Sequence, residues 1–246
     1  VANGCQVVDL GAVPTPIVNF AIQNDPSPAG GAMVTASHNP PTDNGFKLYF
    51  GRQVASPEQL INLAKLVDSG HEDAVGDNGH LQSVNSAEAY LQAMVAEMTS
   101  DGALRPRKIV IDTANAVASP VARALFERLG MQVIVLNGEV DGHFPGHPPN
   151  PADPANLAQL QRAVVEHQAE LGLAFDGDAD RLVAVSGDGA IVWPDRLLML
   201  FAQQLLGQSP DSTVVYDIKC SHQLPQLVTA AGGKPLLCQT GHAFIR

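Results

Sequence analysis

Three aspartates stand at alternate positions in the segment Asp176-Gly177-Asp178-Ala179-Asp180-Arg181. They follow directly on the apolar run 171–175, which has the length and composition of a buried strand. Three neighbouring carboxylates repel one another, and a divalent cation removes that repulsion. Oxygen ligands without His or Cys favour Mg²⁺, Ca²⁺ or Mn²⁺ over zinc. The segment therefore predicts a metal site just beyond the carboxyl end of a strand, where open α/β sheets bind their ligands.

Two other interpretations of this acidic segment compete with a metal site. An EF-hand loop that begins at Asp176 requires Gly at its sixth position and Glu at its twelfth, but the chain has Arg181 and Gly187 there. A solvated acidic turn is the second alternative. We favour the metal site over the turn because five apolar residues lead directly into the acidic segment.

A serine occupies a second polar segment, Thr35-Ala36-Ser37-His38-Asn39-Pro40, which follows the apolar run 31–34. A serine hydroxyl is a poor nucleophile unless a base, a metal or a positive charge assists it. A Ser37–His38 pair is a doubtful hydrolase site, because neighbours on an extended chain point to opposite faces. Taken alone, the segment is more typical of a turn than of a nucleophile.

Lys47 follows in the segment Asn44-Gly45-Phe46-Lys47. A lysine beside a phosphate can position the anion, or can act as an acid or base if its pKa is lowered. The structural alternative is a solvated side chain on a strand. Ser37, Lys47 and the three aspartates together specify a site more strongly than any of them alone.

The elements that must position these residues alternate between short apolar strands and amphipathic helices, which predicts an α/β fold with largely parallel sheets. One α/β unit recurs about every hundred residues, which predicts repeated domains over 1–98, 99–190 and 191–246. The chain ends cut off the pattern in the first and third of these. We expect a piece of a longer protein, because neither end of the chain looks like a natural terminus.

Local signals place several helix boundaries. Ser56 followed by Pro57 and Gln59 predicts a helix start, and Asn85 with Glu88 predicts a capping box that opens a helix to about residue 98. The predicted helices cover 14–23, 57–68, 117–129, 154–168, 194–206 and 222–231. The predicted strands cover 6–10, 31–34, 46–50, 108–112, 131–136, 171–175, 181–186, 190–193, 213–218 and 234–238. The stretch 69–80 is predicted to be a loop.

Composition excludes several classes of protein. With 14 basic and 25 acidic residues the net charge is −11, which argues against nucleic acid as the main partner. The three cysteines are widely spaced and support neither a disulfide framework nor a zinc site, so we expect a cytoplasmic location. No apolar run approaches the length of a membrane span.

His143 and His147 lie in the proline-rich stretch 142–154, where a turn is favoured over a metal site.

The segments around Ser37 and Asp176 resemble the α-D-phosphohexomutase family, in particular its bacterial phosphomannomutase/phosphoglucomutase branch. Further segments that resemble the family are 140–145, 194–197, 217–220 and 239–242. The resemblance extends over essentially the whole chain. It implies an α/β fold built from repeated three-layer domains, with the first and third domains incomplete here.

The resemblance also implies a role for each candidate residue. Ser37 carries a phosphoryl group, and a phosphoserine oxygen joins Asp176, Asp178 and Asp180 as ligands of Mg²⁺. His38, Lys47 and Arg181 surround that phosphate, and Lys47 is the candidate for proton transfer. Lys219 and His242 contact the substrate.

The implied reaction moves a phosphate between C1 and C6 of a hexose, mannose or glucose, through a phosphoserine enzyme and a hexose 1,6-bisphosphate. Its partners are hexose phosphates, with glucose 1,6-bisphosphate as activator, and the expected state is a monomer. Phosphoglucosamine mutase and a non-catalytic relative that binds Mg²⁺ or a sugar phosphate are the alternatives. The family's segments that would precede Val1 and follow Arg246 are absent, so we expect little or no mutase turnover from these residues alone.

Overall fold

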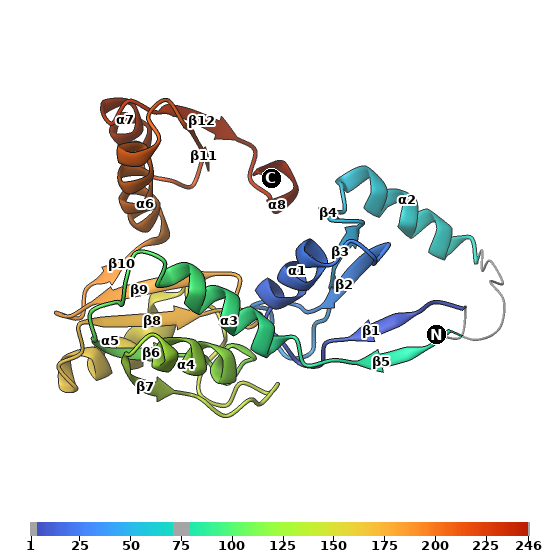
Figure 1. Cartoon of the computed structure of the whole chain (residues 1–246), viewed down its shortest axis with the longest axis horizontal. Helices are drawn as coiled ribbons and strands as arrows, with labels where there is room; N and C mark the ends of the chain where they lie inside the picture. Colours follow the sequence, from blue (N-terminus) through green and yellow to red (C-terminus); the bar gives the residue numbers. More distant parts are fainter. Residues whose placement is uncertain (1–3, 71–78, 246) are drawn as a thin grey trace. The chain divides into compact units, whose positions relative to one another are not determined.

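A computed structural model of the chain describes residues 4–70 and 79–245 (Figure 1). The chain divides into two compact units, Val1–Gly189 and Ala190–Arg246. The first unit contains both the serine segment and the acidic segment. Most of the predicted loop over 69–80 lies outside the described residues, which end at 70 and resume at 79.

The first part of this unit holds two small sheets. Strand β1 (Val7–Asp9) pairs in parallel with β5 (Leu81–Ser83), and β2 (Gly30–Val34), β3 (Phe46–Phe50) and β4 (Gln53–Val54) form an antiparallel sheet. The antiparallel sheet departs from the expected parallel pairing. Parallel neighbours need a crossover, usually a helix, whereas the segment between β2 and β3 is used for the serine loop. The short strands β4 and β5 were not predicted, because two or three residues show no periodicity.

Two helices belong to this part of the chain. Helix α1 (Thr15–Asn24) starts after Pro14 and buries Ile17 and Ile22 in a core that includes Tyr49. Helix α2 (Pro57–Asp68) begins with the predicted signal, since Ser56 and Gln59 form a complete capping box. The buried face of α1, with Ile17 and Ile22, holds the start of that helix in place.

The larger sheet of the first unit has the strand order β9-β8-β6-β7. Its strands and helices are β6 (Lys108–Asp112), α4 (Ala118–Arg128), β7 (Gln132–Leu136), α5 (Pro154–Glu166), β8 (Leu171–Phe175) and β9 (Leu182–Ser186). Strands β6, β7 and β8 are parallel, and β9 is antiparallel to β8. The carboxyl ends of β6 and β8 therefore meet at one edge, where the acidic segment begins.

Close packing of α5 on this sheet requires a glycine. A Cβ atom at Gly172 on β8 would lie 2.6 Å from Val164 Cγ2 and 3.0 Å from Leu160 Cδ1. Both of these side chains are fully buried. The helix thus sits directly on β8, and the strand that leads into the acidic segment is fixed by dense packing.

Helix α3 (Ala87–Met98) starts differently from the prediction. The capping box of Asn85 and Glu88 is wrong: Ser86 is the N-cap residue, and Asn85 Oδ1 accepts a hydrogen bond from Ala87 N at 3.2 Å. The carboxylate of Glu88 instead pairs with Arg128 on α4, at 2.8 Å from its Nη2. A tertiary ion pair between α3 and α4 replaces the local contact that the spacing suggested.

The second unit is a smaller α/β assembly. It contains β10 (Ile191–Val192), α6 (Pro194–Gln208), β11 (Thr213–Asp217), α7 (Gln223–Ala230), β12 (Lys234–Cys238) and α8 (His242–Ile245). Strands β11 and β12 pair in parallel, and Leu206, Leu224 and Val228 lie in its core. No helix in the described part of the chain is both long and apolar enough to cross a bilayer.

Candidate active site

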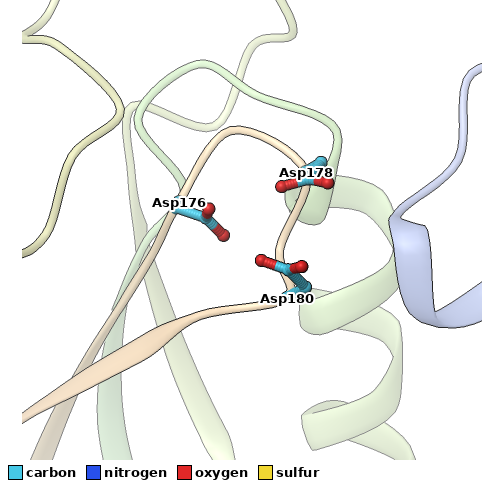
Figure 2. Close-up of side chains that lie close together, drawn as sticks. All are labelled: Asp176, Asp178 and Asp180. Atoms are coloured by element: carbon cyan, nitrogen blue, oxygen red, sulfur yellow. The ribbon is translucent and has the colours of Figure 1, made fainter. Parts of the chain in front are cut away.

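The three predicted aspartates line the turn that follows β8. Figure 2 shows Asp176 on one arm of this turn and Asp178 and Asp180 on the other, with their carboxylate groups on its inner side. One oxygen from each of Asp176, Asp178 and Asp180 lies within 4.8 Å of the others. Asp176 and Asp178 are 0% and 1% exposed, whereas Asp180 is exposed. Ala179 closes the turn in the left-handed region at φ 56°, and its N–H donates to the carbonyl of Asp176 at 3.0 Å.

Ser37 reaches this turn from the loop after β2. Its hydroxyl donates to Asp176 Oδ2 at 2.8 Å, and its backbone N–H donates to Thr35 Oγ1 at 2.8 Å. The guanidinium of Arg181 donates to Ser37 Oγ and to His38 Nδ1, and its Nε lies 2.8 Å from Asp176 Oδ2. Ser37 has a φ of 58°, so the chain is not extended there, and the side chains of Ser37 and His38 reach the same guanidinium.

Lys47 comes to the same site from strand β3. It pairs with Met33 across the β2–β3 ladder, close to the point where β2 passes into the serine loop. Its ammonium group contacts Asp178 Oδ2 and lies 2.6 Å from Asp180 Oδ2. The lysine is therefore a bound cation and not a solvated strand residue.

Thr15 is a site residue that the sequence analysis missed. Its side chain is almost fully buried and donates to Asp178 Oδ2 at 2.5 Å, and its backbone N–H donates to the carbonyl of Asp178 at 2.9 Å. The first residue of α1 thus holds the acidic turn from a position 163 residues away in the sequence. The only local signal was a Thr-Pro helix start, which carries no information about its partner.

The charges in the site shift the titration of its members. Burial raises the pKa of Asp176 above its usual range, against the opposing effect of the Arg181 charge. Burial also acts to raise the pKa of Asp178, but hydrogen bonds from Lys47 and Thr15 outweigh it, and the net shift is downward. Partial burial opposes the charge of Lys47, but its bonds to the carboxylates raise its pKa. Lys47 is thus held as the ammonium ion.

The donor set fits a hard divalent cation. All the candidate ligand atoms are carboxylate or hydroxyl oxygens, which Mg²⁺, Ca²⁺ and Mn²⁺ prefer. Asp178 Oδ1 is buried and has no hydrogen-bond partner among the described residues. An unpaired buried carboxylate oxygen is costly, and a cation placed between the three aspartates would satisfy it.

The proline-rich loop contributes a half-buried histidine, His147, that contacts a buried aspartate. His147 Nε2 lies 3.0 Å from Asp112 Oδ2, and its Nδ1 lies 2.9 Å from the carbonyl of Pro148. Because both ring nitrogens face acceptors, the ring satisfies both only when it carries both protons. The hydrogen bond to buried Asp112 raises the pKa of His147 against the effect of burial. This histidine anchors the loop to the end of β6, which agrees with the structural role favoured for it.

Known proteins match this chain along nearly its whole length. Models of phosphoglucomutase/phosphomannomutase alpha/beta/alpha domains match consecutive ranges: domain I over 1–72, domain II over 88–189 and domain III over 193–246. The chain belongs to the α-D-phosphohexomutase family. The predicted fold class, repeated α/β domains of the phosphohexomutase type, is confirmed.

Individual phosphohexomutases are also similar to this chain along nearly its whole length. The chain is 40% identical over 244 residues to phosphomannomutase/phosphoglucomutase from Pseudomonas aeruginosa, covering 99% of this chain and 51% of the relative. It is 39% identical to phosphoglucomutase from Neisseria meningitidis, with 99% and 52% covered. A solved structure of a phosphoglucomutase/phosphomannomutase family protein from Burkholderia thailandensis has a TM-score of 0.88 and 38% identity, with 99% and 54% covered. The chain spans about half the length of these phosphohexomutases.

Two residues that we expect to contact a substrate, Lys219 and His242, lie in the second unit of this member of the family. The exposed side chain of Lys219 follows β11, and its Nζ lies 3.3 Å from Asp217 Oδ2. His242 is the first residue of α8, and its side chain lies outside the described part of the chain. Of the predicted residues, the first unit brings together Ser37, His38, Lys47, Asp176, Asp178, Asp180 and Arg181.

Proposed function

We propose that this chain carries the phosphoserine and metal centre of a phosphohexomutase that interconverts hexose 1-phosphates and hexose 6-phosphates. One observation carries the proposal: the Ser37 hydroxyl lies 2.8 Å from Asp176 Oδ2, contacts Arg181 and stands beside three clustered carboxylates. A phosphorylated serine at this position has a cation-binding turn on one side and a guanidinium on the other. Positioning and charge neutralisation of this kind are the main requirements of phosphoryl transfer.

The proposed metal is Mg²⁺, held by Asp176, Asp178 and Asp180 and by an oxygen of the phosphoserine. When bound, it offsets negative charge on the phosphoryl group during transfer. Its support is the oxygen-only donor set and the unpaired Asp178 Oδ1. The three carboxylates and the two cations Lys47 and Arg181 sum to a charge of −1, so a divalent cation leaves the site positive enough to attract a phosphate.

The proposed reaction has two phosphoryl transfers, in which Ser37 and Arg181 take part. In the first step the Oγ–P bond of phosphoserine breaks as a free hydroxyl of the sugar monophosphate forms a new O–P bond, and the proton of that hydroxyl passes to the released Ser37 oxygen. The bisphosphate then reorients. In the second step the O–P bond of its other phosphate breaks as Ser37 Oγ forms a new O–P bond, and the serine proton passes to the sugar oxygen that is released. Arg181, already hydrogen-bonded to Ser37 Oγ, stabilises charge at that oxygen.

Lys47 and His38 have supporting places in this proposal. The raised pKa of Lys47 favours a protonated lysine that neutralises charge and can donate a proton, and it disfavours a free base in this state. His38 contacts the same guanidinium as Ser37 and helps to orient it. Lys219 and His242 are the proposed substrate contacts. The monomeric state and the cytoplasmic location stay predictions.

The test is transfer of phosphate to Ser37. The chain is incubated with Mg²⁺ and glucose 1,6-bisphosphate, and intact mass and peptide mapping locate any phosphate, with Ser37→Ala and Ser221→Ala as matched variants. We expect one phosphate on Ser37, no phosphate on the first variant and normal labelling of the second. Equal labelling of wild type and Ser37→Ala, or no phosphate on Ser37 at any concentration of the two reagents, would overturn the proposal.

We propose mannose and glucose phosphates as the substrates, because several relatives are phosphomannomutase/phosphoglucomutases. A probable phosphoglucosamine mutase from Methanopyrus kandleri, 35% identical over 247 residues, represents the minor alternative. The phosphorylated chain is offered mannose 6-phosphate, glucose 6-phosphate and glucosamine 6-phosphate, and loss of phosphate from Ser37 is timed. Faster loss to the first two supports the proposed substrates, whereas faster loss to the third favours the alternative. A chain that binds Mg²⁺ and sugar phosphate but never takes a phosphate is a non-catalytic relative.

A further inference from the structure

The backbone of the serine loop lies directly against Gly177 in the acidic turn. A Cβ atom at residue 177 would stand 2.1 Å from the carbonyl oxygen of Ser37 and 3.3 Å from its carbonyl carbon. It would also lie 3.5 Å from Pro149 Cγ, an ordinary contact distance. The obstruction at this position is therefore backbone, which cannot swing aside as the end of a flexible side chain can.

The conformation of Gly177 does not itself require glycine. Its φ is not among the positive values of the chain, which the turn places instead at Ala179. A positive φ therefore does not exclude an alanine at residue 177. The closeness of the serine loop excludes a side chain at residue 177. Glycine is therefore required there by the contact between the two loops.

We propose that Gly177 is a positioning residue: its lack of a side chain lets the serine loop seat on the acidic turn at the distance that the Ser37 hydroxyl needs. This inference rests on the proposed function. The contact at Gly177 joins the same two loops as the hydrogen bond between Ser37 Oγ and Asp176 Oδ2 at 2.8 Å. The backbone contact that seats the serine loop therefore also fixes the position of the Ser37 hydroxyl.

Both loops are closed by their own hydrogen bonds, so neither absorbs an added methyl group easily. In the serine loop, Ser37 N donates to Thr35 Oγ1 at 2.8 Å, and Thr35 N donates to the carbonyl of Gly45 at 2.9 Å. In the acidic turn, Arg181 N donates to Asp176 Oδ1 at 3.0 Å. A methyl group at 177 therefore separates the two loops without breaking the bonds that close either one directly, and the serine loop, no longer supported by the acidic turn, opens more often.

The size of that separation follows from the contact distance. Moving a carbonyl oxygen from 2.1 Å to an ordinary contact with a methyl carbon requires a shift of about 1 Å. A misplacement of about 1 Å in a reacting group can lower a rate by roughly 100-fold. The three aspartates all belong to the acidic turn, so their spacing, and the binding of a cation by them, change little.

The experiment compares Gly177→Ala with Gly142→Ala. Gly142 also has no positive φ, but a Cβ there meets nothing within 4 Å, so this variant adds a methyl group without the contact made at residue 177. For each chain we would measure the rate of Ser37 phosphorylation by glucose 1,6-bisphosphate, the affinity for Mn²⁺ and amide hydrogen exchange. For Gly177→Ala we expect phosphorylation about 100-fold slower, with Mn²⁺ affinity within about threefold of wild type. Gly142→Ala should match wild type in both.

Hydrogen exchange separates positioning from damage to the fold. In Gly177→Ala we expect faster exchange in residues 35–39 and unchanged exchange in strands 108–112 and 171–175. Faster exchange in those strands too, or a parallel loss of Mn²⁺ binding, would show general destabilisation and overturn the inference, as would a wild-type phosphorylation rate. If the wild-type chain takes no phosphate, the proposed function fails, and exchange in 35–39 alone then decides whether Gly177 seats the serine loop.

Discussion

Replacing Thr15 with valine would test whether the start of α1 holds the acidic turn. Valine has nearly the same shape as threonine but no hydroxyl, so it removes the 2.5 Å hydrogen bond to Asp178 Oδ2. The backbone N–H at residue 15 continues to donate to the carbonyl of Asp178. Asp178 is 1% exposed and its Oδ1 already lacks a partner among the described residues, so the lost bond cannot be replaced cheaply.

The magnitude follows from the kind of bond. A hydrogen bond to a charged group contributes about 1.5–3 kcal/mol to stability, so we expect the free energy of unfolding to fall by about 2 kcal/mol. For a folded unit of this size that loss lowers the Tm by roughly 4–8 °C. Thr99→Val is the matched control, because its hydroxyl bonds only a neutral helix carbonyl, that of Val95, at 2.7 Å. We expect the control to lose about 1 kcal/mol or less.

The assay is urea denaturation of the metal-free chain, followed by circular dichroism and by hydrogen exchange in residues 171–186. A double-mutant cycle of Thr15→Val with Asp178→Ala isolates the contact between the two side chains, and we expect a coupling energy of about 1.5–3 kcal/mol. Coupling below about 0.5 kcal/mol would refute the conclusion that Thr15 holds Asp178. Equal losses in Thr15→Val and Thr99→Val would refute it as well.

Three further changes test other parts of the structure. Asp180→Asn should weaken the binding of Mn²⁺, measured by calorimetry, by about tenfold or more, and should cost little stability because Asp180 is exposed. The control Asp211→Asn, at an exposed aspartate outside the cluster, should leave Mn²⁺ binding unchanged. His147→Gln should destabilise the chain more at about pH 5.5 than at about pH 9. The hydrogen bond to Asp112 raises the pKa of His147 in the folded chain. The stability that protonated His147 contributes is therefore complete below about pH 6.5 and is lost as the pH rises through the raised pKa. Equal destabilisation in urea at both pH values would contradict this ion pair. Leu224→Ala, at a fully buried position in the second unit, should lower stability by about 2–5 kcal/mol, and an unchanged midpoint by tryptophan fluorescence would contradict that core.

Sequence alone predicted the features that depend on near neighbours in the chain. The helix start at Ser56 formed as expected because its capping residues, Ser56 and Gln59, lie within one helical turn. The clustering of Asp176, Asp178 and Asp180 was predictable for the same reason, since a single turn holds all three. The alternation of apolar strands and helices likewise indicated the α/β class, because periodicity reports which faces are buried.

The tertiary structure alone decided which distant residues meet. Ser37 is 139 residues from Asp176, and Thr15 is 163 residues from Asp178, yet both pairs are hydrogen-bonded. A hydroxyl at a helix start looks the same in a sequence whether its partner is water or a buried carboxylate. The convergence depends on packing of whole elements, on α5 seated against β8 and on two loops in contact at Gly177. Such contacts have no local signature, because their free energy comes from surfaces that only the folded chain brings together.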